Sequence, residues 1–231
     1  MKRNLLIAIT LFSAAAAANA DTFAVIPSRA AQNPTDIIDW TQLGPDETQL
    51  STPQSVSSFN GNLARIGNIN GSDFLRVDEG ASWGGNFDFG EPLLWTGNLN
   101  FDAGGLGPMT IVLRNPVLSF GFGIQARLPG PFTARVEAFD VNGSALFGET
   151  FDGFSDNLEN GSALFIGLAD TTGRNVSQVV VSTDSGASNP LFANDFAINS
   201  ISFTVPEAGS IMLLGGALLG MAGAFRRKLR K

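Results

Sequence analysis

Short apolar stretches, separated by clusters of glycine, asparagine, aspartate and proline, recur along most of the 231-residue chain. Between Asp21 and Thr204 no long segment repeats its apolar residues at the 3.6-residue spacing of an amphipathic helix. Short apolar runs between turn residues are typical of an all-β domain. The pattern predicts eleven strands, near Ser55–Phe59, Ala64–Ile69, Phe74–Val77, Leu93–Trp95, Met109–Leu113, Val117–Gln125, Thr133–Val141, Ala145–Phe151, Ala163–Leu168, Ser177–Ser182 and Phe196–Phe203.

The dipeptide Asn142-Gly143 lies between two of these strands. Asn-Gly favours the two positive φ angles of a type I′ turn, so the segment predicts a tight β-hairpin. The tripeptide Asn-Gly-Ser occurs at 70–72 and again at 160–162. Because the flanking segments share no aligned period, each predicts a turn and not a repeat.

Eleven short strands without helices to cover a parallel sheet favour two antiparallel sheets packed face to face. We therefore expect one β-sandwich domain over residues 21–204, with a jelly-roll or lectin-like topology. A domain of this length can bury a sizeable core without disulfides.

The N-terminal 20 residues have the order of a secretory signal peptide. Lys2-Arg3 form a basic start, Leu5–Phe12 an apolar segment, and Ala18-Asn19-Ala20 an Ala-x-Ala site for signal peptidase. We expect cleavage before Asp21. An uncleaved anchor fits less well because the apolar segment is short for a spanning helix, and the lack of cysteine excludes a lipoprotein anchor.

Residues 205–231 carry three signals in order: Val205-Pro206-Glu207-Ala208, an apolar run over Ile211–Phe225, and a basic end at 226–231. The run predicts a single transmembrane helix at 210–225. Its 15 residues are short against the roughly 20 that a helix needs to span a bilayer. Cations behind such a helix remain on the cytoplasmic side, which places the domain outside.

This arrangement resembles the PEP-CTERM sorting tail of exported proteins of Gram-negative bacteria. The resemblance implies transient recognition by an exosortase, an integral-membrane enzyme, while the protein is held in the inner membrane. It implies processing near the motif and delivery to the cell surface or extracellular matrix. Ala208 stands where the family most often has a second proline. A plain C-terminal anchor without processing is the alternative.

The charge of the domain differs from that of the whole chain. Between Asp21 and Thr204 the sequence holds 20 acidic residues and seven arginines, a net charge of −13 against −7 for the full chain. Every lysine lies in the two terminal segments. Such a surface repels phosphates, which argues against nucleic-acid binding. It favours solubility outside the cell and is compatible with the binding of cations or neutral sugars.

The chain has no histidine, cysteine or tyrosine. A Ser-His-Asp triad, a thiol nucleophile and a histidine-based metal site are therefore excluded. Two carboxylates remain possible for catalysis, as in glycoside hydrolases. Candidate pairs are Asp88 with Glu91, and Glu137 with Glu149. Abundant acids are more often solvated surface residues, so we predict a protein that is not an enzyme.

One segment combines the residue types of a sugar site. Trp83 and Trp95 bracket glycines, Asn86 and Asp88, a mix suited to stacking on a sugar ring and bonding its hydroxyls. These four residues are the candidate ligand-binding set. The alternative is that the tryptophans, with Trp40, anchor the core, and this alternative is favoured.

Calcium is the one cofactor that the sequence suggests. Asp140-Val141-Asn142-Gly143 and the loops at 152–156 and 184–195 are rich in oxygen ligands. None has a complete ligand spacing, so ordinary Asx turns are the favoured interpretation and no metal ligand is assigned.

Several motifs spread over the domain resemble a group of uncharacterised secreted bacterial β-sandwich proteins. They include Ser82-Trp83-Gly84-Gly85-Asn86-Phe87, Gly121-Phe122-Gly123 and Asp195-Phe196-Ala197-Ile198-Asn199. The last resembles the closing strand of galactose-binding-like and lectin-like sandwiches, with Asn199 in place of the usual acid. The resemblance implies a fold and not an activity.

The sequence thus predicts an exported envelope or extracellular-matrix protein with a structural or adhesive role and weak carbohydrate binding. Exopolysaccharide is the expected partner. The alternative is a carboxylate-based glycoside hydrolase that acts on exopolysaccharide.

Overall fold

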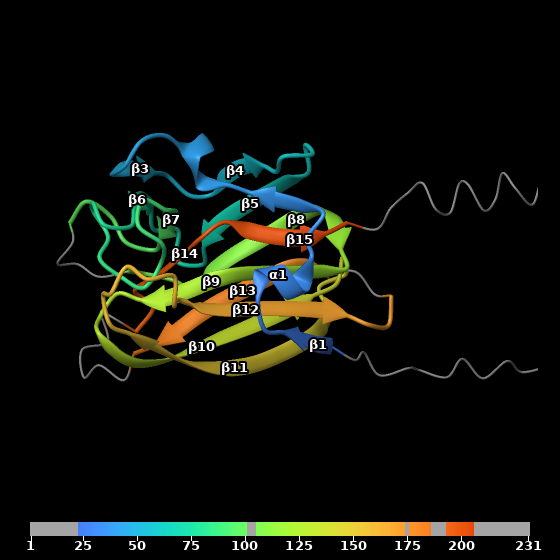
Figure 1. Ribbon diagram of the computed structural model, residues 1–231. Helices are drawn as coiled ribbons and strands as arrows, with labels where there is room; N and C mark the ends of the chain where they lie inside the picture. The colour runs from blue at the N-terminus through green and yellow to red at the C-terminus, as the bar shows by residue number, and fades with distance from the viewer. Residues whose placement is uncertain (1–22, 101–104, 174–175, 186–192, 206–231) are drawn as a thin grey trace, which may run out of the picture.

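A computed structural model describes residues 23–100, 105–173, 176–185 and 193–205, which form two antiparallel β-sheets (Figure 1). The helical elements are short: α1 (Arg29–Gln32) and a 3-10 turn at Trp40–Leu43. The predicted all-β sandwich is confirmed.

The larger sheet, called sheet A, has the order β1-β12-β9-β14-β7-β6-β3, and β15 pairs with both β9 and β2. Its strands are β1 (Phe23–Ile26), β2 (Asp36–Ile38), β3 (Thr48–Leu50), β6 (Phe74–Asp78), β7 (Pro92–Trp95), β9 (Ser119–Ala126), β12 (Leu164–Asp170), β14 (Phe196–Ile198) and β15 (Ile201–Thr204). The smaller sheet, sheet B, has the order β11-β10-β13-β8-β5-β4. Its strands are β4 (Gln54–Ser57), β5 (Leu63–Asn68), β8 (Met109–Val117), β10 (Gly130–Phe139), β11 (Ala145–Ser155) and β13 (Val176–Asp184).

Each of the eleven predicted strands overlaps a strand of the structure. The segment predicted as one strand over Phe196–Phe203 is two, because Asn199 and Ser200 leave the ladder between β14 and β15. The strands β1, β2 and β3 were not predicted. Each has only three or four residues, too few to show an alternation of apolar and polar positions.

The main core fills the space between the sheets. On β10 the inward residues Phe132, Ala134, Val136 and Ala138 are buried, and the residues between them face outward. Phe120 and Phe122 of β9 meet them from sheet A. Burial of each such phenylalanine contributes about 1.5–3 kcal/mol, so the alternation along the strands determines which face of each sheet turns inward.

Sheet A also carries a smaller hydrophobic cluster on its outer face. Leu75, Leu93 and Trp95 alternate with residues of the main core and pack with Trp83 and Phe87. The latter two belong to the loop between β6 and β7, which folds back over the sheet. Part of sheet A is therefore buried on both faces.

The predicted hairpin between β10 and β11 is confirmed, but its turn is not type I′. Gly143 has φ +78°, whereas Asn142 is not among the residues with positive φ. The Asp140 carbonyl accepts from Gly143 N–H, and Asp140 N–H donates to the Ser144 carbonyl. This is a longer turn with a bulge. The Asp140 carboxylate favours it by accepting from Asn142 N–H and Ser144 N–H, each at 2.8 Å.

The predicted signal peptide (1–20), the cleavage site at Asp21 and the tail from Pro206 onward lie outside the described residues. Val205 is described, and its N–H donates to Oγ1 of Thr35 at 3.1 Å. Within the described ranges no helix has the length and apolar character needed to cross a membrane.

Candidate functional site

A polar pocket lies on the outer face of sheet A. Beside it, α1 packs on β9 and β12 (Figure 1). β9 makes room for it with glycine at two outward positions. A Cβ at Gly121 would lie 2.6 Å from Cζ of Phe165 and 2.9 Å from Oε1 of Gln32. A Cβ at Gly123 would lie 2.9 Å from Nδ2 of Asn199. Glycine is required here for close approach and not for a turn.

The helix α1 is tied to the sheet by its last residue. The buried Gln32 donates through Nε2 to the Ser202 carbonyl at 3.0 Å, and Oγ of Ser202 donates to Oε1 of Gln32 at 2.5 Å. Ser28 caps the start of the helix by accepting from Ala31 N–H at 3.1 Å. Because both ends are fixed, the Arg29 side chain is directed along the sheet toward Asn199 and Ser200.

A chain of hydrogen bonds joins Arg29, Asn199 and Glu91. The Arg29 guanidinium donates to Oδ1 of Asn199 at 2.9 Å, to the Ser200 carbonyl at 2.7 Å, and to Oγ of Ser200. Gly123 N–H also donates to Oδ1 of Asn199, at 2.6 Å. Nδ2 of Asn199 then donates to Oε1 of Glu91 at 2.9 Å. These contacts fix the orientation of the Asn199 amide and connect a cation to a carboxylate.

The cavity beside this chain has a volume of about 380 Å³. We call it the outer-face pocket; its lining includes Arg29, Asp88, Glu91, Asn199, Gly123 and Phe165. The Phe165 ring is half-buried and rests over the backbone of β9 and β12. The pocket therefore joins carboxylate, amide and guanidinium groups to one aromatic surface.

The pKa values of the charged groups reflect partial burial. Burial raises the pKa of Glu91, and hydrogen bonds from Asp88 N–H and Asn199, together with the charge of Arg29, oppose this rise. Burial likewise lowers the pKa of Arg29, opposed chiefly by the charge of Glu91. Each ion thus stabilises the charged form of the other.

The four residues predicted as a ligand set are found in three different environments. Trp83 and Trp95 pack against each other, with ring centroids 5.7 Å apart, and are 5% and 0% exposed. With Arg127, whose guanidinium lies 4.9 Å from the Trp95 ring centroid, they border a separate hollow of about 280 Å³. Trp95 Nε1 donates to Oδ1 of the buried Asp195. The two tryptophans mainly anchor the outer cluster of sheet A.

Asn86 is buried and holds loops together. Its Oδ1 accepts from Asp156 N–H at 2.8 Å, its Nδ2 donates to Oγ of Ser162 at 2.9 Å, and its N–H donates to Oε1 of Gln125. Asp88, by contrast, is exposed and lines the outer-face pocket with Glu91. The structure thus brings together the acid pair Asp88 and Glu91 but separates Asp88 from the tryptophans.

The second proposed acid pair lies elsewhere. Glu137 is on the outer face of β10, where its Oε1 lies 2.8 Å from Nη2 of Arg135, and Glu149 is on the neighbouring strand β11. Glu149 pairs with the core residue Val136, so the two carboxylates lie on opposite faces of sheet B. Among the described residues, no three acidic side chains are grouped so that they could hold a metal ion.

Arg29 and Phe165 were not identified as site residues from the sequence, and Asn199 was noted only through a resemblance. No local motif marks them, since they lie on α1, β12 and the β14–β15 connection. The one available signal was the alternation of glycine with apolar residues in Gly121-Phe122-Gly123, which indicates close approach of other groups to that face.

Comparisons with known proteins identify no family. No family model matches the chain, and no curated protein matches it. Among solved structures, a DUF4465 family protein from Bacteroides caccae aligns with 73% of this chain and 99% of its own, at 10% identity and TM-score 0.41. A DUF4465 family protein from Bacteroides ovatus aligns with 79% of this chain and 98% of its own, at 12% identity and TM-score 0.29. The CBM22-1-GH10 modules of a Clostridium thermocellum xylanase align with 71% of this chain and 29% of their own, at 11% identity and TM-score 0.26. Likenesses this distant carry no argument about function.

Proposed function

We propose that the protein is an exported saccharide-binding protein of the cell envelope or extracellular matrix, with a structural or adhesive role. The observation that carries the proposal is the outer-face pocket, in which Arg29, Asn199 and Glu91 are held by one another and Asp88 remains exposed. Signal peptide, PEP-CTERM tail and exosortase recognition belong to the same proposal. They supply the route by which the domain would leave the cell.

The groups of the pocket suit the hydroxyls of a sugar. Carboxylates accept two or more hydrogen bonds, a guanidinium and an amide donate them, and a half-exposed phenyl ring packs on C–H groups. Groups that are already oriented lose little freedom on binding, which favours affinity from a small contact area. A lectin-like use of the sandwich is consistent with the −13 charge of the domain, because neutral sugars are not repelled.

A glycan array with the purified protein tests the binding claim. We expect selective binding that Glu91→Gln weakens by about tenfold, because Glu91 loses an acceptor and its charge balance with Arg29. Glu137→Gln is the matched control, since it removes the same charge from the solvent face of sheet B. Equal binding by both variants, or none by the wild type, would contradict a saccharide site in this pocket.

The sorting claim has a separate test. In a host with its exosortase we expect the mature C-terminus to lie near Pro206-Glu207, and in a strain without the enzyme we expect the tail to persist. Mass spectrometry of the purified protein distinguishes these forms. An identical C-terminus in both strains would show that exosortase does not process the chain.

A glycoside hydrolase is the second candidate, and one observation favours it. Asp88 and Glu91 border one cavity, and burial raises the pKa of Glu91 as a general acid requires. On this hypothesis Glu91→Gln would retain saccharide binding and lose the release of reducing ends. No reducing ends from exopolysaccharide incubated with the wild type would exclude it.

A further inference from the structure

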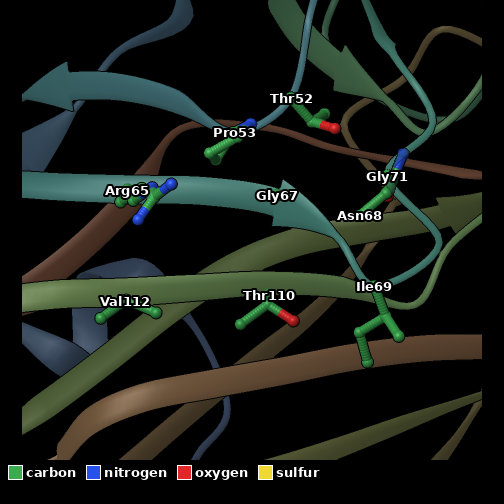
Figure 2. Close-up of a pocket in the computed structure, with 9 residues that line it drawn as sticks. All are labelled: Thr52, Pro53, Arg65, Gly67, Asn68, Ile69, Gly71, Thr110 and Val112. Atoms are coloured by element: carbon green, nitrogen blue, oxygen red, sulfur yellow. The ribbon is translucent and has the colours of Figure 1, made fainter.

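A second groove lies on the outer face of sheet B, on strands β5 and β8. The antiparallel register pairs Arg65 with Val112 and Gly67 with Thr110. The residues between them along each strand, among them Ile66, are buried in the core. The paired residues therefore point away from the core and form the floor of a groove of about 300 Å³ (Figure 2).

The walls of this groove are apolar and exposed. Pro53 lies along one side of β5, and Ile69 follows the end of that strand (Figure 2). Ile69 is 61% exposed and Val112 is 42% exposed. A Cβ at Gly67 would lie 3.6 Å from Cβ of Pro53, an ordinary contact, so the groove is open at its centre. Apolar side chains thus surround the position of Arg65.

Arg65 and Arg114 differ from the other described arginines. Arg76, Arg127 and Arg135 each pair with an acidic side chain, and Arg29 is bound to Asn199 and Ser200. Within the described part of the chain, Arg65 and Arg114 have no carboxylate at ion-pair distance, and both are exposed on the same face of sheet B. Of the six arginines that the structure describes, Arg65 and Arg114 are therefore the two with neither a carboxylate at ion-pair distance nor a side-chain hydrogen bond to another described residue.

The residue Asn68 closes one end of the groove but does not turn its side chain into it. Asn68 pairs with the core residue Met109 and is 7% exposed, so its side chain lies on the core face of β5. Its Nδ2 donates to the Ser72 and Asp73 carbonyls at 3.1 and 3.2 Å, which fixes the turn after β5. The ligand contacts therefore come from the outward residues of β5 and β8.

We propose that this groove binds an acidic saccharide, a sugar chain that carries carboxylates such as a uronic acid polymer. The carboxylate pairs with the Arg65 guanidinium, for which two parallel N–H donors are the best geometry. The C–H face of the ring packs on Pro53, Ile69 and Val112. Arg114, two residues beyond Val112 on β8, meets the next carboxylate along the chain.

Charge complementarity favours this occupant over a second copy of the protein. A two-fold contact centred on the groove would place Arg65 and Arg114 of one copy near those of the other, whereas Glu137 on this face is already paired with Arg135. The net charge of the domain does not prevent binding, because charges farther than about 8 Å are screened at physiological ionic strength. This site is separate from the outer-face pocket, so either can be absent without the other. Two saccharide sites on different faces would allow one molecule to link two polymer chains.

Calorimetric titration of the full chain with an oligogalacturonate tests the proposal. We expect binding that Arg65→Gln weakens by about tenfold and Arg114→Gln by less, with a decline in affinity as salt increases. Arg135→Gln is the matched control, since it removes the same charge from the same sheet face but Arg135 is already paired with Glu137. It should change affinity by less than about twofold. Each substituted side chain is exposed, so thermal unfolding should be unchanged.

Three results would overturn the proposal. The first is no binding of oligogalacturonate. The second is an equal loss in Arg65→Gln and Arg135→Gln, which would mean that only bulk charge is sensed. The third is tighter binding of an oligoglutamate peptide, which would make the partner an acidic protein segment. Glu91→Gln should weaken the binding only of sugars that occupy the outer-face pocket. Titration of the wild type and Glu91→Gln with a maltooligosaccharide of equal length therefore distinguishes binding in that pocket from binding in the groove on sheet B.

Discussion

The outer faces of the two sheets are built differently. On sheet A all eight residues of β9 are buried, because α1, Phe165, Asn199 and the β6–β7 loop cover that side. On sheet B, β10 alternates buried and exposed positions, and its outward residues meet solvent. A strand that is buried on both sides has no solvent-facing row. At its outward-facing positions sheet A therefore has glycines and hydrogen-bonded polar side chains, whereas sheet B has ordinary solvent-exposed residues.

The difference between the two outer faces bears on the kind of saccharide that each would bind. Polar groups on the covered face are held by hydrogen bonds, as Asn199 is, and so present one fixed arrangement to a ligand. The arginines on the open face keep their freedom and can adapt to successive carboxylates of a flexible chain. The two candidate sites thus favour different kinds of saccharide, a compact one on sheet A and an extended acidic one on sheet B.

The largest expected effect concerns Trp95. Because Trp95 is fully buried in the outer cluster of sheet A, Trp95→Ala should lower the free energy of unfolding by about 3–5 kcal/mol. Val112→Ala, on the open face of sheet B, should change it by no more than about 0.5 kcal/mol. Urea unfolding measures both. A Trp95→Ala variant as stable as the wild type would mean that Trp95 is a surface platform for a ligand.

The next effect is the pH dependence caused by Glu79. Glu79 is 1% exposed, and its carboxylate accepts from Gly85 N–H at 2.5 Å, a bond that closes part of the β6–β7 loop. Burial, with a smaller contribution from the charge of Glu159, raises the pKa of Glu79 from 4.5 to about 7. The folded state then binds this proton more tightly than the unfolded state. As pH rises from 4.5 to about 7, stability should fall by roughly 3 kcal/mol from this group alone and then level off.

Glu79→Gln removes this contribution because an amide does not ionise. Relative to the variant, the wild type should lose stability between about pH 5 and about pH 8 in urea unfolding. Glu137→Gln, on the exposed face of sheet B, should follow the wild-type curve. If the wild type and Glu79→Gln lose stability in parallel over this range, the pKa of Glu79 is not raised in the folded protein.

The smallest effects come from adding one methyl group to each face. Gly121→Ala should destabilise by about 1–3 kcal/mol, since its Cβ would meet Phe165, Gln32 and the Gly167 backbone. Gly67→Ala meets only Pro53, at ordinary contact distance, and should change stability by no more than about 0.5 kcal/mol. Thermal unfolding compares the two. Similar costs at both positions would mean that the outer face of sheet A is no more closely packed than that of sheet B.

Alternation along the chain predicted the strands of sheet B well, because their outward residues are polar or exposed. It predicted the existence of β9 and β14 but not that they are covered, since Phe120-Gly121-Phe122-Gly123 alternates in the same way as a half-exposed strand. A glycine in the sequence does not show which residues pack against it in the folded protein. The turn at Asn142-Gly143 differs from the predicted type I′ turn because the Asp140 carboxylate accepts from Asn142 N–H and Ser144 N–H and so favours a longer turn.

The candidate site was less predictable. Asp88 and Glu91 are neighbours in sequence and were named as a pair, but Arg29 and Asn199 come from segments separated by 170 residues. Only the topology brings α1 onto β9, where the β14–β15 connection passes. The tryptophans drew attention because they are rare and suit sugar stacking, although their size also makes them good core residues.

The most direct test of the central claim is NMR mapping of the best saccharide from the glycan array onto the isotope-labelled protein. We predict that the largest shift changes occur at Gly123 N–H, the Asn199 side-chain amide and the Arg29 guanidinium, and that Glu91→Gln reduces them. Changes confined to the open face of sheet B, or to the hollow beside Trp83 and Trp95, would contradict the assignment of saccharide binding to the outer-face pocket.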